Sequence, residues 1–480
     1  MQTPVSKTLI HEPASMPGRA DGRPRSPIPP NRRSPIGSPA VTRRAFLKTA
    51  GAIACLLRSQ AARAARGVEA EDDEILAKSR AGIEQHRKSD VLLLLRSAAG
   101  EPVSRADVLV EQTRHDFLFG CNFFMFDRLG EAEREAAYRE QFRAVFNYAT
   151  LGFYWANYER QQGSPNYDYT DRVVDYCLRH GITCKGHPLV WDNPAGSPSW
   201  LPEDAAAIQR LSQARVRDIV TRYKGRIEYW DVVNEPTHLP EGHNRTRMAQ
   251  WGRTTGPVEY VAQHLQVARE ANPAATLLVN DYRLDMPYYR ILERLRTGDG
   301  PAFDAVGLQS HMHGGVWPLR KARDTADLYA QLGRPLHFTE ITILSGSQAD
   351  RDGRQAATTP EGEQRQAEQT ARFYTTLFAH PAVRAMTWWD FSDAGAWQRA
   401  PAGWLRRDMT RKPVYDRMHK LIKGDWWTRV QATPDPRGCV ALRAFHGTHR
   451  VTIVLPSGQK VHHDIHVKAG EPNRFELKLA

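Results

Sequence analysis

Eight short runs of residues that favour β-strands alternate with longer stretches of helical patterning, and this alternation most restricts how the chain can fold. The predicted strands cover residues 117–124, 146–155, 182–191, 229–235, 276–282, 305–312, 336–341 and 385–391. Strands that alternate with helices form parallel sheets, and eight such units close into a barrel. Most runs end in polar or aromatic residues, which indicates an active face at the carboxyl ends of the strands. We therefore predict an α/β protein with a (β/α)8 TIM barrel over residues 115–425.

The segments on either side of the predicted barrel have the patterning of short strands. Residues 65–114 are expected to hold a helix and a β appendage, in which 90–96 and 106–111 form a hairpin-like pair around a turn at Gly100. Residues 426–480 contain alternating runs between glycine-containing turns. The sequence therefore predicts small β appendages before and after the barrel, the second being a C-terminal module.

Residues 1–64 are interpreted as a leader with an export signal and not as part of the fold. Arg43 and Arg44 precede an apolar stretch at 49–57, an order typical of a twin-arginine signal peptide. A membrane anchor is the alternative, but this stretch is far shorter than the roughly 20 residues of a membrane span. We expect cleavage after Ala64, a periplasmic or extracellular protein without stable membrane insertion, and the twin-arginine export machinery as a transient partner.

The positive charge of the chain lies mainly in this leader. The formal net charge is +12, and residues 1–64 contain eleven Lys or Arg against two acidic residues. A net charge of +3 is left for the remainder of the chain. Because a basic patch or stripe is the electrostatic footprint of nucleic-acid binding, we expect no nucleic-acid partner.

Two glutamates stand at the ends of the fourth and seventh predicted strands. Glu235 follows Asn234 and precedes Pro236, which stops the strand, while Glu340 lies within 336–341. Retaining cleavage of a glycosidic bond needs two carboxyl groups, one to protonate the leaving oxygen and one to attack the anomeric carbon. We therefore predict Glu235 as the acid/base and Glu340 as the nucleophile. A lone glutamate in such a place would more often be a salt-bridged structural residue.

Six segments, in the same order, resemble glycoside hydrolase family 10, the family of endo-β-1,4-xylanases. The resemblance covers about 115–425 and is carried by Gly-His-Pro-Leu-Val-Trp at 186–191, Trp-Asp-Val-Val-Asn-Glu-Pro at 230–236, Asn-Asp-Tyr at 280–282, Leu-Gln-Ser-His at 308–311, the segment 336–341, and Thr-Trp-Trp at 387–389. It implies a retaining β-glycoside hydrolase whose partner is a carbohydrate, either xylan or a related extracellular β-glycan.

The resemblance also implies roles for seven residues beyond the carboxylate pair. They are His187 and Trp191 beside the sugar next to the scissile bond, Asn234 at the sugar 2-hydroxyl, Gln309 in contact with sugar, His311 as the residue that orients the nucleophile, and Trp389 and Trp397 of the eighth strand, where Trp389 stacks under the sugar. Taken singly, each histidine could be a buried structural residue and each tryptophan a packing residue. Strand alternation would point Asn234 away from Glu235, so its role depends on the resemblance alone.

The chain departs from the family pattern near the end of the second predicted strand, where a Glu-Asn pair and a Lys normally bind sugars on the non-reducing side of the cleaved bond. Gly152 and Phe153 occupy the pair, and Ala156 occupies the Lys position. Tyr154 and Trp155 would instead offer stacking faces, which discriminate hydroxyl patterns poorly. We therefore expect weak activity on plain linear xylan and better turnover of a substituted β-glycan or a small β-glycoside.

Three further departures concern residues close to the expected site. Asp192 replaces a histidine, Thr342 replaces an aspartate two places after the nucleophile, and Asp390 replaces a glycine. The resemblance therefore supports the catalytic pair more strongly than it supports a particular sugar.

The expected chemistry needs only carboxyl groups and water, so we predict no metal and no organic cofactor, and we expect a monomer. The cysteines after the leader are too few for a disulfide framework, and free buried thiols are expected, with a bridge between Cys177 and Cys184 as the alternative. A family-derived carbohydrate-binding protein with little turnover is the alternative function. The presence of both glutamates and His311 argues against it, because binding needs no nucleophile.

Overall fold

The computed structural model describes residues 70–346 and 358–479. The predicted leader, with its twin-arginine signal, lies outside the described residues. None of the helices that the structure describes combines the length and the hydrophobicity of a membrane span.

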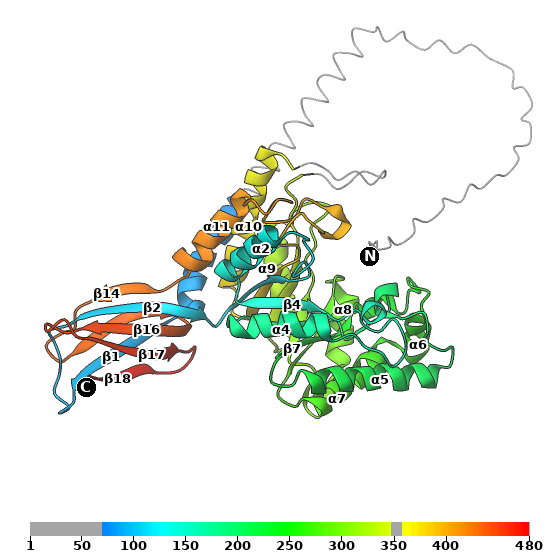
Figure 1. Ribbon diagram of the computed structural model, residues 1–480, viewed down its shortest axis with the longest axis horizontal. Helices are drawn as coiled ribbons and strands as arrows, with labels where there is room; N and C mark the ends of the chain where they lie inside the picture. Colours follow the sequence, from blue (N-terminus) through cyan, green and yellow to red (C-terminus); the bar gives the residue numbers. More distant parts are fainter. Residues whose placement is uncertain (1–69, 347–357, 480) are drawn as a thin grey trace, which may run out of the picture. The chain divides into compact units, whose positions relative to one another are not determined.

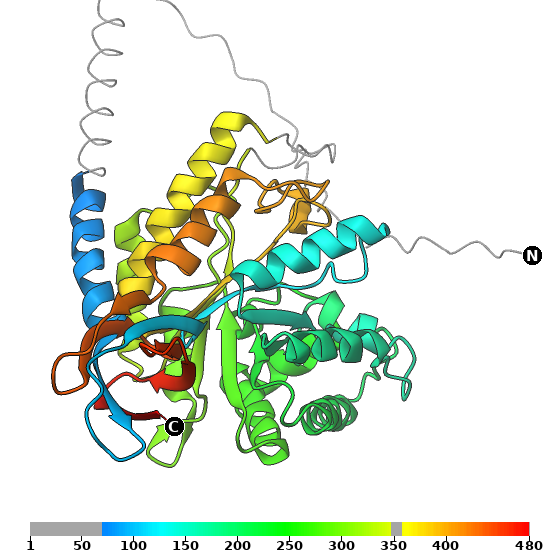
Figure 2. The same cartoon turned by 60° about the vertical axis from the view of Figure 1, so that its left-hand side comes forward.

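Eight parallel strands form a closed barrel, which confirms the predicted (β/α)8 architecture (Figures 1 and 2). They are β3 (Leu118–Asn122), β4 (Tyr148–Gly152), β5 (Thr183–His187), β7 (Tyr229–Asn234), β8 (Thr276–Asp281), β11 (Ala305–Leu308), β12 (Leu336–Ile341) and β13 (Val383–Trp388). The ring closes because β5 pairs with β7 and β13 pairs with β3. The short strand β6 (Val190–Trp191) pairs beside the end of β7. Each predicted run overlaps one strand of the ring.

Helices connect successive barrel strands, and a further helix follows the last barrel strand. They are α2 (Ala132–Val145), α3 (Trp155–Tyr158), α4 (Asp168–Arg179), α5 (Ala205–Arg222), α6 (Arg247–Thr255), α7 (Pro257–Ala271), α8 (Met286–Arg294), α9 (Leu319–Ala330), α10 (Pro360–Ala379) and α11 (Pro413–Lys420), with the short turns η1 (Pro194–Gly196), η2 (Pro236–His238), η3 (Trp397–Arg399) and η4 (Leu421–Asp425). A helix over 70–87 precedes the first strand, and β9 (Arg296–Thr297) with β10 (Gly300–Pro301) forms a small ladder. Side-chain caps fix helix starts, as where Asp204 accepts from the backbone N–H of Ala207.

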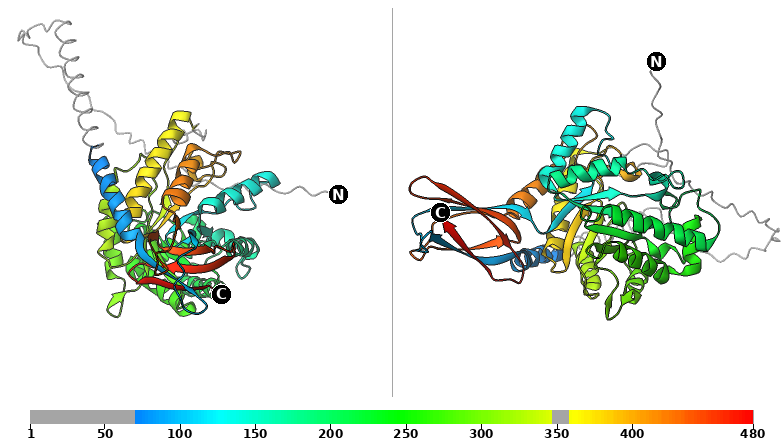
Figure 3. Two further views of the ribbon diagram at one scale, coloured as in Figure 1. Left: turned by 90° about the vertical axis from the view of Figure 1, so that its left-hand side faces the viewer. Right: turned by 60° about the horizontal axis from the view of Figure 1, so that its bottom comes forward.

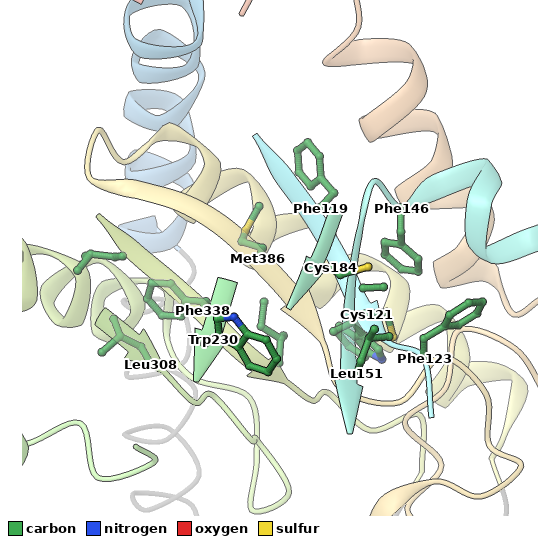
Figure 4. Packing of buried hydrophobic residues seen from close by; sticks show 14 of the residues in the cluster. Phe119, Cys121, Phe123, Phe146, Leu151, Cys184, Trp230, Leu308, Phe338 and Met386 are labelled. Atoms are coloured by element: carbon green, nitrogen blue, oxygen red, sulfur yellow. The ribbon is translucent and has the colours of Figure 1, made fainter. Parts of the chain in front are cut away.

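The barrel strands are short and apolar because helices cover them on the outer face while side chains fill the interior. Both β3 and β12 are buried along their whole length. Figure 4 shows Trp230, Phe338 and Met386 among the residues of this core. A Cβ on Gly186 would come within 2.1 Å of the Trp230 ring, so the glycine of the third strand is required by packing.

The β segments before and after the barrel confirm the predicted β appendages, and their strands combine into one β-sandwich (Figure 3). One sheet contains β15 (Cys439–Phe445), β1 (Lys88–Ser97) and β18 (Asn473–Leu479), and the other contains β14 (Arg429–Ala432), β2 (Asp107–His115), β16 (Gly447–Val454) and β17 (Lys460–Val467). The predicted hairpin-like pairing is wrong, since β1 and β2 lie in different sheets.

Alternating apolar side chains explain this arrangement of the sandwich. Val91, Leu93 and Leu95 of β1 belong to one buried cluster with Val108 and Val110 of β2 and with apolar residues of the C-terminal strands. Each of the two strands has a hydrogen-bonded neighbour on both sides, whereas an isolated hairpin is only marginally stable in water. The buried faces therefore favour two stacked sheets over one local pair.

Candidate active site

All nine predicted site residues come together at the carboxyl ends of the barrel strands. Direct contacts, together with hydrogen bonds from Asn280, link them into one cluster of the two glutamates, His187, Trp191, Asn234, Gln309, His311, Trp389 and Trp397. They come from segments that are distant in the sequence, so the closed barrel is what assembles the site.

Glu235 follows the last residue of β7 and has a left-handed backbone conformation, with φ 56° and ψ 49°. Such a conformation is uncommon for a residue with a side chain. It breaks the period-two alternation of the strand, and Gln309 Nε2 lies 3.0 Å from Glu235 Oε1 and 3.3 Å from Asn234 Oδ1. The expectation that Asn234 points away from Glu235 is therefore wrong, because both side chains reach the same amide.

The environment of Glu235 favours its protonated form. Burial raises the pKa of this carboxyl to about 8, and the negative charges of Glu340 and Asp281 act in the same direction. Hydrogen bonds from Gln309 and from the Trp191 indole, 3.0 Å from Oε2, oppose the shift but do not cancel it. A carboxyl that keeps its proton at neutral pH can serve as a general acid.

The environment of Glu340 favours its ionised form. His311 Nε2 lies 2.8 Å from Oε2, and the Asn280 amide donates to Oε1 at 2.7 Å. Burial alone would raise the pKa of Glu340, but the His311 hydrogen bond and the nearby His187 and Lys185 outweigh it and hold the pKa below its ordinary value. The two environments thus favour opposite protonation states of the two carboxyls at neutral pH.

Asn280, at the end of β8, connects the two halves of the site. Its Nδ2 donates to Glu340 Oε1 and to Asn234 Oδ1 at 2.7 and 2.8 Å, while its Oδ1 accepts from the Thr339 hydroxyl at 2.6 Å. A continuous chain therefore runs from Glu340 through Asn280, Asn234 and Gln309 to Glu235. The Asn-Asp-Tyr motif located this residue in the sequence, but its linking role depends on distances that no sequence pattern contains.

A buried Lys-Asp-His group lies behind the nucleophile. Lys185 Nζ and His187 Nδ1 lie 2.7 and 2.8 Å from the same oxygen of Asp231, and His187 Nε2 lies 4.0 Å from Glu340 Oε1. Sequence reasoning missed Lys185 and Asp231. Their signal was a charged residue inside an otherwise apolar strand, which seldom occurs unless the charge is paired.

Aromatic side chains form the walls of the site. Trp389 packs at right angles to the rings of His187, His311 and Phe124, at centroid distances of 5.4, 5.8 and 5.5 Å. Trp397 lies 4.6 Å from the His311 ring and is 46% exposed. At the mouth of the barrel, the ring of Trp389 is therefore mostly buried and the ring of Trp397 is open to solvent.

The prediction that Tyr154 and Trp155 offer stacking faces to the sugar holds only in part. Tyr154 is half-buried, with its ring 5.7 Å from His187 and 6.0 Å from Trp191, so it lies in the site. Trp155 is buried and donates to Glu159 at 2.8 Å, and therefore offers no stacking face. Phe153 is also buried in the core. The prediction for Trp155 is wrong because α3 begins at this residue and turns its side chain away from the mouth.

The three other departures each have a defined partner. The Thr342 hydroxyl lies 2.9 Å from His311 Nδ1, so a neutral group takes the place of an aspartate beside the histidine that holds Glu340. Asp390 accepts the backbone N–H of Trp397 at 3.2 Å, and Asp192 accepts from the Asn244 amide at 2.9 Å.

In the part of the chain that the structure describes, no cluster of three or more His, Cys, Asp or Glu could hold a metal. Cys177 and Cys184 are free buried thiols.

Substitution of Glu340 by glutamine should lower the pKa of Glu235 from about 8, because the repelling charge is removed while burial stays. The change can be measured by a carbon NMR titration of side-chain carboxyls. The exposed residue Glu293 offers a matched control, since Glu293→Gln should leave the pKa of Glu235 unchanged. An equal pKa in wild type and Glu340→Gln would show that the two carboxyls do not interact.

A (β/α)8 barrel with a glutamate at the end of its fourth strand and another on its seventh, joined by one hydrogen-bonded chain, has the architecture of a glycoside hydrolase. The family model described as Glycosyl hydrolase family 10 matches residues 111–421, and the chain belongs to that family.

Three relatives illustrate how far the similarity extends. The anti-sigma-I factor RsgI6 of Acetivibrio thermocellus is 25% identical over 395 residues, which cover 81% of this chain and 48% of that protein. Endo-1,4-beta-xylanase 2 of Arabidopsis thaliana is 24% identical over 80% of this chain and 34% of its own length. Endo-1,4-beta-xylanase B of Thermotoga neapolitana is 28% identical over 58% of this chain and 78% of its own length. The chain thus spans half or less of the first two relatives.

Solved structures share the barrel. Xylanase 10B of Thermotoga petrophila, solved in complex with xylobiose, superposes with a TM-score of 0.55 at 23% identity, covering 65% of this chain and 95% of that one. At this level of identity the likeness concerns the fold.

Proposed function

We propose that the protein is a retaining β-glycoside hydrolase that cleaves xylan or a related β-glycan by double displacement. The observation that carries the proposal is the opposite protonation of two carboxyls within one hydrogen-bonded chain, with a raised pKa for Glu235 and a lowered pKa for Glu340. A nucleophile must be ionised and a general acid must hold a proton at the same pH.

In the first step, a Glu340 oxygen attacks the anomeric carbon while the bond to the leaving oxygen breaks and that oxygen takes the proton of Glu235. The covalent ester removes the negative charge of Glu340, which lowers the pKa of Glu235. Glu235 can then accept a proton from water, whose oxygen attacks the same carbon and releases Glu340. Since Asn234 Oδ1 already accepts two hydrogen bonds, its amide nitrogen is the group left to donate to the sugar.

The mechanism is tested by following the hydrolysis of aryl β-glycosides by proton NMR. The first sugar released should have the β configuration, because two displacements restore the starting stereochemistry. A first product of α configuration would contradict double displacement. Binding without turnover across a broad panel would support the alternative of a carbohydrate-binding protein.

We further propose that the substrate is a substituted β-glycan or a small β-glycoside. Phe153 is buried and Ala156 has no polar group, so neither can replace the hydrogen bonds of the Asn and the Lys in the family pattern, whereas the ring of Tyr154 offers an aromatic wall. A charged hydrogen bond contributes about 1.5 to 3 kcal/mol, which a stacking face does not replace selectively. Low efficiency on unsubstituted xylohexaose should follow.

The measurement is kcat/KM on xylohexaose against decorated xylans, β-glucans and aryl glycosides. An efficiency on xylohexaose near the upper part of the range of about 10⁴ to 10⁸ M⁻¹s⁻¹ would return the protein to the ordinary xylanases. Tyr154→Ala should lower kcat/KM on the preferred substrate roughly twofold to tenfold, which corresponds to an aromatic contact of about 0.5 to 1.5 kcal/mol. Tyr154→Phe is the matched control and should keep most of the activity.

Export by the twin-arginine route is proposed from the sequence of the leader. Replacement of Arg43 and Arg44 by lysine should trap the precursor inside the cell, because the route reads the arginine pair. Cell fractionation with an antibody against the protein would check this. Mature protein outside the inner membrane at the normal level would contradict the route.

A further inference from the structure

We propose that His238 is a positioning residue that couples the leaving-group side of the site to the acid/base carboxyl, an inference that rests on the function proposed above. Its two ring nitrogens face two different groups. Nε2 lies 2.7 Å from the Tyr282 hydroxyl, and Nδ1 lies 3.4 Å from Glu235 Oε2. Among the described residues, His238 alone contacts both of these side chains.

The backbone holds His238 in this place. Pro236 begins the turn η2 directly after the left-handed residue Glu235, and the His238 N–H donates to the Glu235 carbonyl at 3.2 Å. The buried carboxylate of Asp281 accepts from both the backbone and the hydroxyl of Thr237, at 3.1 Å and 2.8 to 2.9 Å. The imidazole is therefore fixed beside Glu235 by a short and well-anchored turn.

Tyr282 lies on the side of Glu235 where a leaving group would sit. The residues expected to contact the sugar on the non-reducing side follow β4, and the barrel order β4, β5, β7, β8 places the end of β8 on the opposite side of Glu235. Tyr282 follows β8 directly and is 44% exposed, which is unusual for so large a ring and leaves it open to a bound group. His238 therefore connects an open aromatic face with the proton donor.

The groups around the imidazole indicate which of its two nitrogens carries the proton. Burial lowers the pKa of His238 to about 4, with contributions from His243 and Arg283 and an opposing one from Glu241, so the ring is neutral at neutral pH. Nδ1 is buried without a hydrogen-bond partner among the described residues. The atoms that face it are carboxyl oxygens, Glu235 Oε2 and, at 3.9 Å, Asp192 Oδ1. This setting favours a proton on Nδ1, with Nε2 accepting from the Tyr282 hydroxyl.

This N–H matters at the moment when Glu235 gives up its proton. Oε2 then becomes negative. The indole N–H of Trp191 already donates to it at 3.0 Å, and His238 Nδ1, which makes no hydrogen bond in this structure, lies 3.4 Å away and can become a second donor. Donors aimed at a charge that develops during the reaction lower the barrier. The benefit should be greatest for leaving groups that need full protonation, so the loss of His238 should act selectively on those substrates.

The test compares His238→Ala and His238→Asn with wild type on aryl β-glycosides whose leaving groups span a wide range of acidity. We expect kcat/KM to fall about tenfold or more for the most basic leaving groups and less than about threefold for the most acidic. The alkaline limb of the pH profile should move to higher pH, because a donor that favours ionised Glu235 is missing. Tyr282→Phe should give a smaller change in the same direction.

The exposed residue His180 supplies the control. It lies between α4 and the first residues of β5, at the amino ends of the barrel strands, and His180→Asn should leave the leaving-group dependence within about twofold of wild type. An equal loss on all leaving groups, or an unmoved alkaline limb, would show that His238 is merely structural. A carbon NMR titration of Glu235 keeps this test separate from the proposed function, since it needs no turnover. If wild type hydrolyses no glycoside, an unchanged Glu235 pKa in His238→Ala overturns the proposal, and a higher pKa supports it.

Discussion

Glu340→Ala should abolish turnover of ordinary β-glycosides, because it removes the carboxylate that we propose as the nucleophile. Glu340 is buried, ionised and held by His311 and Asn280, so its removal also leaves those donors without their acceptor. Activity should fall by far more than the roughly 100-fold that marks the low end for a single acid/base group. The loss is measured as kcat/KM on an aryl β-glycoside.

Azide provides the decisive control for this variant. A small anion can enter the space left by the carboxylate and attack the anomeric carbon directly, so activity should recover partly and the glycosyl azide should have inverted configuration. The exposed residue Glu293 on α8 is a matched substitution, and Glu293→Ala should behave as wild type. Absence of rescue together with a retained thermal unfolding transition would speak against Glu340 as the nucleophile.

Glu235→Ala should separate the two steps of the reaction. Substrates with good leaving groups need no protonation, so they should still form the glycosyl-enzyme quickly, whereas its hydrolysis should slow by roughly 10² to 10⁴ because the base is missing. A burst of released phenol followed by a slow steady state is the expected signal in stopped-flow measurements. Substrates with poor leaving groups should lose activity in the first step as well.

The predictions for Glu340→Ala and Glu235→Ala test one assignment, that of the carboxylate pair. If neither variant differs from wild type by at least about 100-fold, the assignment of the carboxylate pair is wrong. A large effect on every leaving group in Glu235→Ala, without a burst, would indicate that this residue supports the structure of the site instead of transferring a proton.

The barrel could be predicted from the sequence because its information is local. Each strand is a short apolar run with a polar end, and eight such runs in alternation with helices allow few other folds. The two strand-end glutamates could be predicted for the same reason, since Asn-Glu-Pro and Thr-Glu-Ile place a carboxyl at a strand end without reference to distant residues.

Other features depend on contacts between residues that are far apart in the sequence, or on the exact residue at which a helix or strand begins. The change from β4 to α3 decides that Tyr154 faces the site while Trp155 is buried, and propensities cannot place such a boundary to one residue. The joint role of Asn234 and Glu235 depends on one left-handed backbone angle. The partners of β1 and β2 lie more than 300 positions further along the chain, and a periodic sequence pattern cannot identify partners at such a distance.

The shared sandwich has a consequence for the order of events during synthesis. β2 ends at His115 and its neighbour β14 begins at Arg429, so the ribosome makes the whole barrel before the second sheet can close. At about 5 to 20 residues per second this interval lasts roughly 15 to 60 seconds. During that time the apolar faces of β1 and β2 lack their final partners, and unpaired strands of this kind are prone to aggregate. The sandwich can therefore close only after the last strands of the chain have been translated.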